Sequence, residues 1–320
     1  MTVLITGGTG FIGANVARLL LARGEGPVVV FDRNASPQRL DEIAEKVEIV
    51  QGDLGNFSHV LHAVERSRPE VIFHLGGMLS FPSEADPAAA LQANAMGTYH
   101  VLEAARLFKV PKVIFSSTIA TFGMDITEPV LTDDTIQRPE LFYGITKVFG
   151  EQLGFYYRRK YDLDFRGVRF PSIVGPGVRT PAIVQYNSWV IEECAKGNPY
   201  EIYVDPETRC PVMYFKDAAR SLVRLADAPR EAIKRGVYVI AGVTPIVTAG
   251  ELADLVRAQI PGAQITFNPD RELQPILDRL LLPPDDRNAQ QEWGWEAAYT
   301  QADVIDDFLR ELRDHPQRYQ

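Results

Sequence analysis

Short apolar runs rich in β-branched residues alternate with amphipathic stretches over the first two-thirds of the chain. The runs occupy residues 3–6, 28–31, 47–50, 71–74, 113–116 and 165–170. They are almost continuously apolar, which is typical of strands buried on both faces of a parallel sheet. Parallel neighbours need long crossover connections, usually helices. The pattern therefore predicts an open parallel sheet built from right-handed βαβ units.

The segments between the runs carry apolar residues at helical spacing. Helices are predicted at residues 11–22, 39–44, 60–65, 91–108 and 142–161. Beyond Pro171, prolines and glycines interrupt the next 40 residues, which indicates a smaller, loop-rich lobe. Further elements are predicted at 217–226 (helix), 237–240 (strand), 249–259 (helix) and 301–313 (helix). We also expect Trp293 and Trp295 to anchor the core of the C-terminal lobe.

These elements predict an α/β protein, a Rossmann doubly wound parallel sheet with a smaller C-terminal α/β substrate lobe. We expect residues 1–171 to form the dinucleotide-binding domain, to which the chain returns at 215–241. The segments 172–214 and 242–320 are then expected to form the substrate-binding lobe.

A glycine-rich turn joins the first strand to the first helix. It reads Thr6-Gly-Gly-Thr-Gly-Phe-Ile-Gly13, and two registers fit, one beginning at Gly7 and one at Gly8. Glycines allow the tight turn and let the backbone approach a pyrophosphate, which then sits on the helix N-terminus. Asp32 ends the second strand, where a carboxylate binds the ribose 2′-hydroxyl and favours NAD over NADP. Arg33 beside it weakens that preference.

The composition argues against several classes of binding partner. The chain has 320 residues, with 33 basic and 42 acidic side chains and a formal net charge of −9. This balance argues against a nucleic-acid binder, which usually shows basic patches, and no apolar run is long enough for a membrane span. Two cysteines provide neither a disulfide framework nor metal-site spacing, and residues 1–6 read as a strand rather than a targeting segment. We expect a cytoplasmic protein with a small-molecule substrate, no metal, and neither nucleic-acid nor membrane partner.

Tyr143 and Lys147 are four residues apart, on one face of a predicted helix. A phenol is a poor base at neutral pH, but a nearby ammonium and an oxidised nicotinamide would favour the phenolate. Tyr143 could then accept the proton of an alcohol while a hydride leaves for the nicotinamide. The strand before this helix ends in Ser116-Ser117-Thr118, and one of these hydroxyls could bind the reacting oxygen.

Together these motifs resemble the extended short-chain dehydrogenase/reductase superfamily, and within it the NAD-dependent epimerase/dehydratase family. The resemblance is carried by residues 6–13, 53–54, 74–77, 117–123 and the Tyr143/Lys147 pair, and extends over essentially the whole chain. It implies that Thr118, five positions before Gly123, is the catalytic hydroxyl beside Tyr143 and Lys147.

The same resemblance implies an NAD site. The residues expected to bind the cofactor are Gly7, Gly10, Phe11, Ile12, Gly13, Asp32, Arg33, Asp53, Leu54, Leu75, Gly76, Gly77, Tyr143, Lys147 and Pro171. Asp53 and Leu54 would contact the adenine, and residues 75–77 would line the cofactor beside the fourth strand. The family more often has two alanines in place of Gly76 and Gly77, and we expect the smaller residues not to disturb binding.

The second half of the chain resembles the branch of short-chain-type L-threonine 3-dehydrogenases. Arg169-Phe170-Pro171 has proline where sugar epimerases usually carry asparagine, and residues 161–166, 205–214 and 283–295 are also similar to that branch. In this branch Ser80, Thr118, Tyr143 and a threonine after the sixth strand, here Thr180, contact the amino acid.

Other features depart from that branch. Residues 179–182 read Arg-Thr-Pro-Ala where the branch has a Thr-Thr-Asp-Tyr-like stretch, and Gly175-Pro176 is more typical of epimerases. Arg179 could pair with a carboxylate or a phosphate, and Arg209 stands where epimerases place a diphosphate-binding arginine. We expect these two arginines and Arg169 to lie near a pocket for an anionic substrate.

Three functions follow from this pattern. The first is NAD-dependent oxidation of a secondary alcohol, on an L-threonine-like β-hydroxy amino acid or a small hydroxy acid, with Tyr143 as base. The alternative is a nucleotide-sugar epimerase or dehydratase with tightly bound NAD, and a more distant one is a non-catalytic NAD(H)-sensing protein. The resemblance also implies a homodimer formed through the helices predicted at 91–108 and 142–161.

Overall fold

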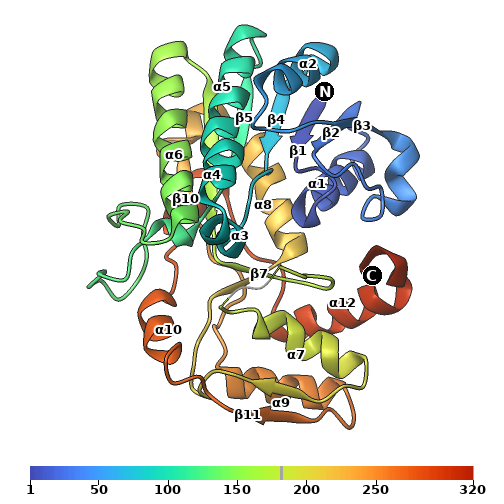
Figure 1. Ribbon diagram of the computed structural model, residues 1–320, viewed down its shortest axis with the longest axis vertical. Coiled ribbons are helices and arrows are strands. Elements are labelled where there is room, and N and C mark those ends of the chain that lie inside the picture. The colour runs from blue at the N-terminus through green and yellow to red at the C-terminus, as the bar shows by residue number, and fades with distance from the viewer. Residues whose placement is uncertain (181–182, 320) are drawn as a thin grey trace.

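The computed structural model describes residues 1–180 and 183–319, and its centre is a seven-stranded parallel sheet (Figure 1). The strands are β1 (Val3–Thr6), β2 (Val28–Asp32), β3 (Val47–Gln51), β4 (Val71–His74), β5 (Lys112–Thr118), β6 (Asp164–Phe170) and β10 (Val237–Val239). Their order is β10-β6-β5-β4-β1-β2-β3. The direction of winding reverses between β1 and β4, and this is where doubly wound folds bind ligands. The predicted fold class is confirmed.

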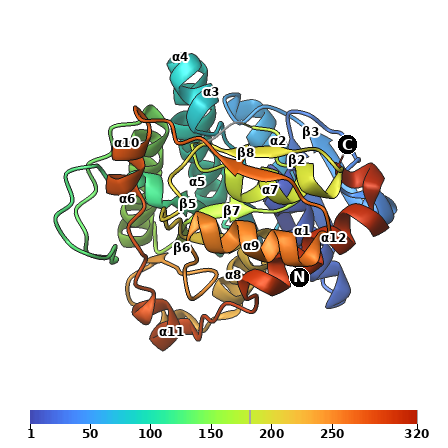
Figure 2. The same ribbon diagram turned by 90° about the horizontal axis from the view of Figure 1, so that it is seen from below.

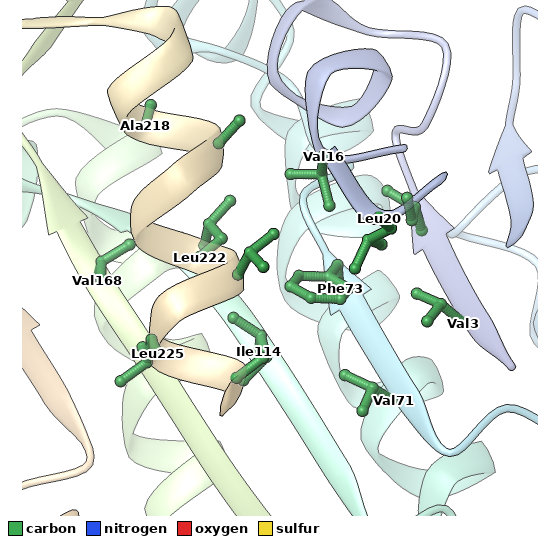
Figure 3. Close-up of a cluster of buried hydrophobic side chains, with 14 of the residues drawn as sticks. Val3, Val16, Leu20, Val71, Phe73, Ile114, Val168, Ala218, Leu222 and Leu225 are labelled. Atoms are coloured by element: carbon green, nitrogen blue, oxygen red, sulfur yellow. The ribbon is translucent and has the colours of Figure 1, made fainter. Parts of the chain in front are cut away.

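Helices cover both faces of this sheet. On one face lie α1 (Phe11–Ala22) and α8 (Phe215–Asp227), and on the other α2 (Phe57–Ser67), α5 (Gly97–Leu107) and α6 (Phe142–Tyr161). Figure 3 shows Val16 and Leu20 of α1 facing Leu222 of α8 across Phe73. Within the described residues, none of the helices is both long enough and apolar enough to span a membrane.

Two predicted helices differ from the structure. The segment predicted at 39–44 is a short 3₁₀-helix, Asp41–Lys46, because Leu40 turns inward into the core while Arg39 lies over the Phe11 ring. The helix predicted at 91–108 begins earlier, as α4 (Pro87–Ala90), where the Asp86 side chain caps the N-terminus. It then passes through a π-helical turn, Leu91–Met96, before α5.

The second half of the chain builds a smaller core beyond the carboxyl ends of the sheet strands (Figures 1 and 2). Two small parallel sheets pair β7 (Ser172–Val174) with β9 (Val212–Tyr214) and β8 (Tyr200–Ile202) with β11 (Ile265–Phe267). The helices here are α7 (Tyr186–Ala195), α9 (Ala249–Gln259), α10 (Gln274–Leu280) and α12 (Gln301–Asp314). Pro181 and Ala182, in the predicted substrate lobe, lie outside the described residues.

The expectation that Trp293 and Trp295 anchor the C-terminal lobe is wrong. Trp293 ends α11 (Arg287–Trp293), and both indoles are buried in the core of the seven-stranded sheet. Trp293 packs edge-on against Tyr238 of β10, and the Trp295 ring N–H donates to the Ala241 carbonyl, 2.9 Å away. The chain returns to the sheet here because β10 offers an apolar face that these rings cover.

The C-terminal residues connect the two halves of the molecule. Arg318 is buried and forms ion pairs with Asp41 (2.8 Å) and Glu42 (2.7 Å) after β2, and with Glu311 (3.1 Å) of α12. The Tyr319 carbonyl accepts a hydrogen bond from Arg179, 2.6 Å away. One buried guanidinium therefore ties the dinucleotide side of the molecule to the smaller core.

Replacing Arg318 with alanine is expected to lower the free energy of unfolding by about 3 kcal/mol, because it leaves the buried Glu311 carboxylate with fewer partners. Urea denaturation followed by circular dichroism measures this. Arg313→Ala is the matched control, because Arg313 is 72% exposed and forms its ion pair with its neighbour Asp314, so about 0.5 kcal/mol or less is expected. Equal effects of the two substitutions would contradict the cross-link.

Candidate active site

The glycine-rich turn lies at the carboxyl end of β1 and is shaped by contacts that exclude side chains. Gly7 has a φ of +68°, and a Cβ there would lie 2.7 Å from the Cα of Gly76. A Cβ on Gly13 would collide with the Gly7 carbonyl. Helix α1 begins after Gly10 with no side-chain cap, so its first N–H groups stay available for an anion. This cradle fits the pyrophosphate of a dinucleotide, with Phe11 and Ile12 in the first turn.

Asp32 is held beside this cradle. Its carboxylate accepts hydrogen bonds from the backbone N–H of Thr9 (3.3 Å) and of Asn34 (3.2 Å). The carboxylate therefore stands at the end of β2, where a ribose hydroxyl can reach it. The Arg33 side chain is exposed beside it.

The remaining cofactor candidates gather at the ends of β3 and β4. Asp53 accepts the Gly55 N–H at 2.8 Å, and the Leu54 side chain lies against Gly76. A Cβ on Gly76 would meet Leu54 at 2.8 Å, and one on Gly77 would meet the Asn94 Oδ1 at 2.9 Å. In this chain the two glycines are therefore fitted to their neighbours, which goes beyond the expectation that they are merely tolerated. Pro171 is buried between β6 and β7.

Thr118 is the last residue of β5, and helix α6, which carries Tyr143 and Lys147, packs against that strand. The Lys147 Nζ donates to the Ser116 carbonyl at 2.8 Å and lies 5.7 Å from the centre of the Tyr143 ring. The Thr118 hydroxyl oxygen accepts the Ala120 N–H at 3.1 Å, which leaves its hydrogen available for another oxygen. The phenol and the ammonium of α6 thus lie near the strand end that carries the Thr118 hydroxyl, and a Cβ on Gly77 would lie 3.9 Å from the Lys147 Nζ.

Burial sets the protonation of this group. It lowers the pKa of Lys147 to about 8, an effect that the Glu151 carboxylate opposes. Burial also raises the pKa of Tyr143 well above its ordinary value. The phenol is therefore no base on its own, and it becomes one only when positive charge lies close to it.

Two acidic side chains support the helix that carries Tyr143. The Glu84 carboxylate, from α3 (Ser80–Ala85), accepts the Phe142 N–H at 2.7 Å and so caps α6, whose own N-cap residue supplies no side-chain bond. Glu151 lies one turn beyond Lys147, fully buried against Ser117 and Arg169. Sequence analysis missed both residues. The spacing of Glu151 from Lys147 could have indicated it, whereas nothing in the sequence marks Glu84.

Each of the three arginines expected near an anionic substrate has an acidic partner in the structure. The expectation for Arg169 is wrong, because this buried residue pairs with Glu151 at 2.7 Å beneath the site. Arg179 pairs with Glu192 (2.7 Å), and Arg209 is exposed, donates to the Ile246 carbonyl and lies 3.7 Å from Glu251.

Two hydroxyl side chains were also expected to touch substrate. Ser80 is the first residue of α3, and the exposed Phe81 ring follows it. Thr180 is half-buried at the edge of the described residues.

Comparison with known proteins decides the family. The family model for the NAD dependent epimerase/dehydratase family matches residues 3–241. The chain belongs to this family. The predicted NAD-dependent enzyme, and NAD as its cofactor, are therefore confirmed.

Individual relatives cover most of the chain. The mitochondrial L-threonine 3-dehydrogenase of Bos taurus is 31% identical over 312 residues, 96% of this chain and 81% of that protein. The D-erythronate dehydrogenase of Cupriavidus necator is 34% identical over 269 residues, 80% of this chain and 81% of that protein. The predicted resemblance to the threonine dehydrogenase branch is confirmed.

A solved structure agrees with these relatives. The holo form of a GalE-like L-threonine dehydrogenase from Cupriavidus necator is 28% identical, with a TM-score of 0.88 over 98% of this chain and 100% of that one. The apo form of the same protein gives a TM-score of 0.74 over 97% of this chain and 99% of that one, at 27% identity. The structure is therefore more similar to the holo form.

His74, at the end of β4, provides a test of the electrostatics of the site. Burial and the nearby Lys147 cation lower the pKa of His74 to about 3, so the unfolded chain binds a proton there at a higher pH than the folded protein does. Stability from this residue is present above pH 6.5 and is lost as the pH falls towards 3. Between pH 7 and 5, wild type is expected to lose about 2 kcal/mol of unfolding free energy relative to His74→Gln.

Urea titrations at several pH values measure this difference. The exposed His62→Gln is the control, and its curve should run parallel to wild type. A His74→Gln curve that also runs parallel to wild type would mean that His74 takes up a proton inside the folded protein.

Proposed function

We propose that the enzyme oxidises the secondary alcohol of a small β-hydroxy amino acid or hydroxy acid, with L-threonine as the first substrate to test. The grouping of Thr118, Tyr143 and Lys147 at the glycine-rich cradle carries this proposal. The threonine and erythronate dehydrogenases among its relatives support it, because both names describe oxidation of a small hydroxylated acid.

Bound NAD in its oxidised form would supply both the hydride acceptor and a positive charge on the nicotinamide ring. Tyr143 takes the proton of the substrate hydroxyl, and Thr118 donates a hydrogen bond to the same oxygen. Lys147 lies beneath the phenol ring and stabilises the phenolate. Burial raises the pKa of Tyr143 and lowers that of Lys147, so each favours its uncharged form, and the positive charge of the nicotinamide would favour the phenolate.

The cofactor would bind along the carboxyl edge of the sheet. The turn at Gly7–Gly13 would hold the pyrophosphate, Asp32 and Arg33 the adenosine ribose, and Asp53 and Leu54 the adenine. Leu75–Gly77 and Pro171 would line the nicotinamide half. In this arrangement residues 1–171 with 215–241 hold the dinucleotide, and 172–214 with 242–320 hold the substrate. The two separate cores support this division, although α11 packs on the sheet.

The substrate would lie between Tyr143 and the smaller core. Ser80 and Thr180 are proposed to bind its polar groups. Arg179 and Arg209 are the cations proposed for its carboxylate. Because Arg179 already pairs with Glu192, its attraction for a second anion is weakened. That partial neutralisation favours one carboxylate over the diphosphate of a nucleotide sugar.

Turnover distinguishes the proposed function from its alternatives. With NAD and L-threonine or a panel of small hydroxy acids, absorbance of the reduced nicotinamide is expected to rise. An epimerase would convert nucleotide sugars without net NADH, and a sensor would bind NAD without turnover. No NADH from any member of the panel would contradict the proposal.

Tyr143→Phe is expected to lower kcat by at least about 100-fold, because it removes the base. The NAD dissociation constant, measured by quenching of tryptophan fluorescence, is expected to change little. Tyr161→Phe is the matched control, because this tyrosine lies on the same helix with its ring exposed and is expected to keep wild-type activity. Full activity of Tyr143→Phe would contradict the assigned role.

We further propose a cytoplasmic homodimer formed through α5 and α6, which lie side by side (Figure 1). The support is an apolar surface on these helices and the π-helical turn before α5. It comprises Leu91, Tyr99, Ile145, Phe149 and Tyr156, each 36–48% exposed. Pairing with a second copy would remove these side chains from water.

Light scattering is expected to give twice the 35.7 kDa chain mass for wild type, and a single chain for Phe149→Asp, because a carboxylate would be buried in the interface. Ile136→Asp is the control, since Ile136 is also exposed to solvent (63%) but lies outside α5 and α6. A monomeric wild type would contradict the dimer.

A further inference from the structure

His74 is buried at the end of β4 and uses both ring nitrogens. Its Nδ1 lies 2.8 Å from the Thr6 hydroxyl of β1, and its Nε2 lies 3.0 Å from the Thr98 hydroxyl of α5. The imidazole therefore bridges the first strand of the sheet and the helix that follows the π-helical turn.

The partners decide which nitrogen carries the hydrogen. Thr98 donates its single hydroxyl hydrogen to the Asn94 carbonyl at 2.6 Å, so it can only accept from the His74 Nε2–H. The neutral ring then accepts at Nδ1 from the Thr6 hydroxyl. The Thr6 oxygen in turn accepts the backbone N–H of Leu75 and of Gly76, both at 3.2 Å. The bonds thus run in one direction from the loop after β4 to Asn94.

Asn94 continues this chain of bonds to the catalytic helix. Its Oδ1 accepts the Met78 N–H at 2.7 Å, and its Nδ2 donates to the Met78 carbonyl (3.0 Å) and to the Thr146 hydroxyl (3.2 Å). Thr146 donates to the backbone carbonyl of Tyr143 at 2.7 Å. The carboxamide has no alternative orientation that keeps these bonds, because its oxygen must face the Met78 N–H.

The π-helical turn Leu91–Met96 makes this placement possible. An extra residue in the turn rotates Asn94 relative to a regular α-helix, and such turns occur often at functional sites. Asn94 is buried, as are His74 and Thr98. A lost bond here would leave a buried polar group unsatisfied, so each member of the network holds its neighbour in place.

We propose that His74 and Thr98 are positioning residues, which hold Asn94 in the π-helical turn so that the first turn of α6 places Tyr143 against the loop that follows β4. Because that loop is the proposed nicotinamide wall, the network connects the cofactor side of the site to the base. This inference rests on the proposed alcohol oxidation.

Thr98→Val tests the network, since it replaces a hydroxyl with a methyl group of similar size. The His74 Nε2–H then loses its acceptor and the Asn94 carbonyl loses a donor. We expect kcat to fall about tenfold through displacement of Tyr143, with the NAD dissociation constant within about twofold of wild type. Thr98→Ser restores the hydroxyl and should restore kcat. If Thr98→Val does not fold, Thr98→Ala replaces it with the same serine rescue.

A double-mutant cycle with Thr146→Val separates positioning from general destabilisation. If both residues act along one path, the double variant loses about as much kcat as the more damaging single variant. Ser221→Ala on α8 is the control, because it also removes a buried hydroxyl bonded to a helix carbonyl and should leave kcat unchanged.

The outcomes distinguish this inference from the proposed function. Wild-type kcat in Thr98→Val, failure of serine to rescue, losses that multiply in the double variant, or an equal fall in NAD affinity would each overturn the network. Absence of turnover in wild type itself would overturn the proposed function instead.

Discussion

The close approach of two loops at the centre of the sheet is the constraint on which the site depends. The turn after β1 and the loop after β4 meet where Gly7 faces Gly76, with no room for a Cβ between them. This contact occurs where the strand order reverses, which is the position at which doubly wound folds bind ligands. The hydroxyl of Thr6, one residue before Gly7, stabilises the second loop through the N–H groups of Leu75 and Gly76.

A buried ion pair supports the catalytic group from below. Arg169 of β6 and Glu151 of α6 join the helix that carries Tyr143 and Lys147 to the strand beside β5. The Ser117 hydroxyl also donates to Glu151, so the residue next to Thr118 is bound to the same carboxylate. Such pairs contribute little net stability compared with apolar packing, but removing one partner is costly. The pair is therefore better understood as fixing the geometry between β5, β6 and α6.

Sequence analysis predicted the parts of the molecule that depend on local pattern. The buried strands, the glycine-rich turn, and the spacing of Tyr143 and Lys147 all follow from neighbouring residues. The π-helical turn at Asn94 does not, because its partners Met78, Thr98 and Thr146 come from separate elements. The same holds for Trp293. From the sequence its apolar ring could pack in either core, and only the three-dimensional path of the chain places it on the large sheet. Arg169 shows the opposite error, since a charge in a functional motif was expected to face a ligand and faces Glu151 instead.

The raised pKa of Tyr143 explains why so many groups converge on one phenol. Burial alone makes Tyr143 a weaker acid, and the buried Lys147 also loses its charge more readily than an exposed lysine. The phenol is therefore neutral at pH 7, whereas Lys147, with a pKa of about 8, keeps most of its charge. The positive charge of an oxidised nicotinamide would shift the phenol towards its ionised form, and only when the dinucleotide is bound. Tyr143 would then act as a base only in the complex with the oxidised cofactor. This requires the phenol to be held close to the position of the nicotinamide ring.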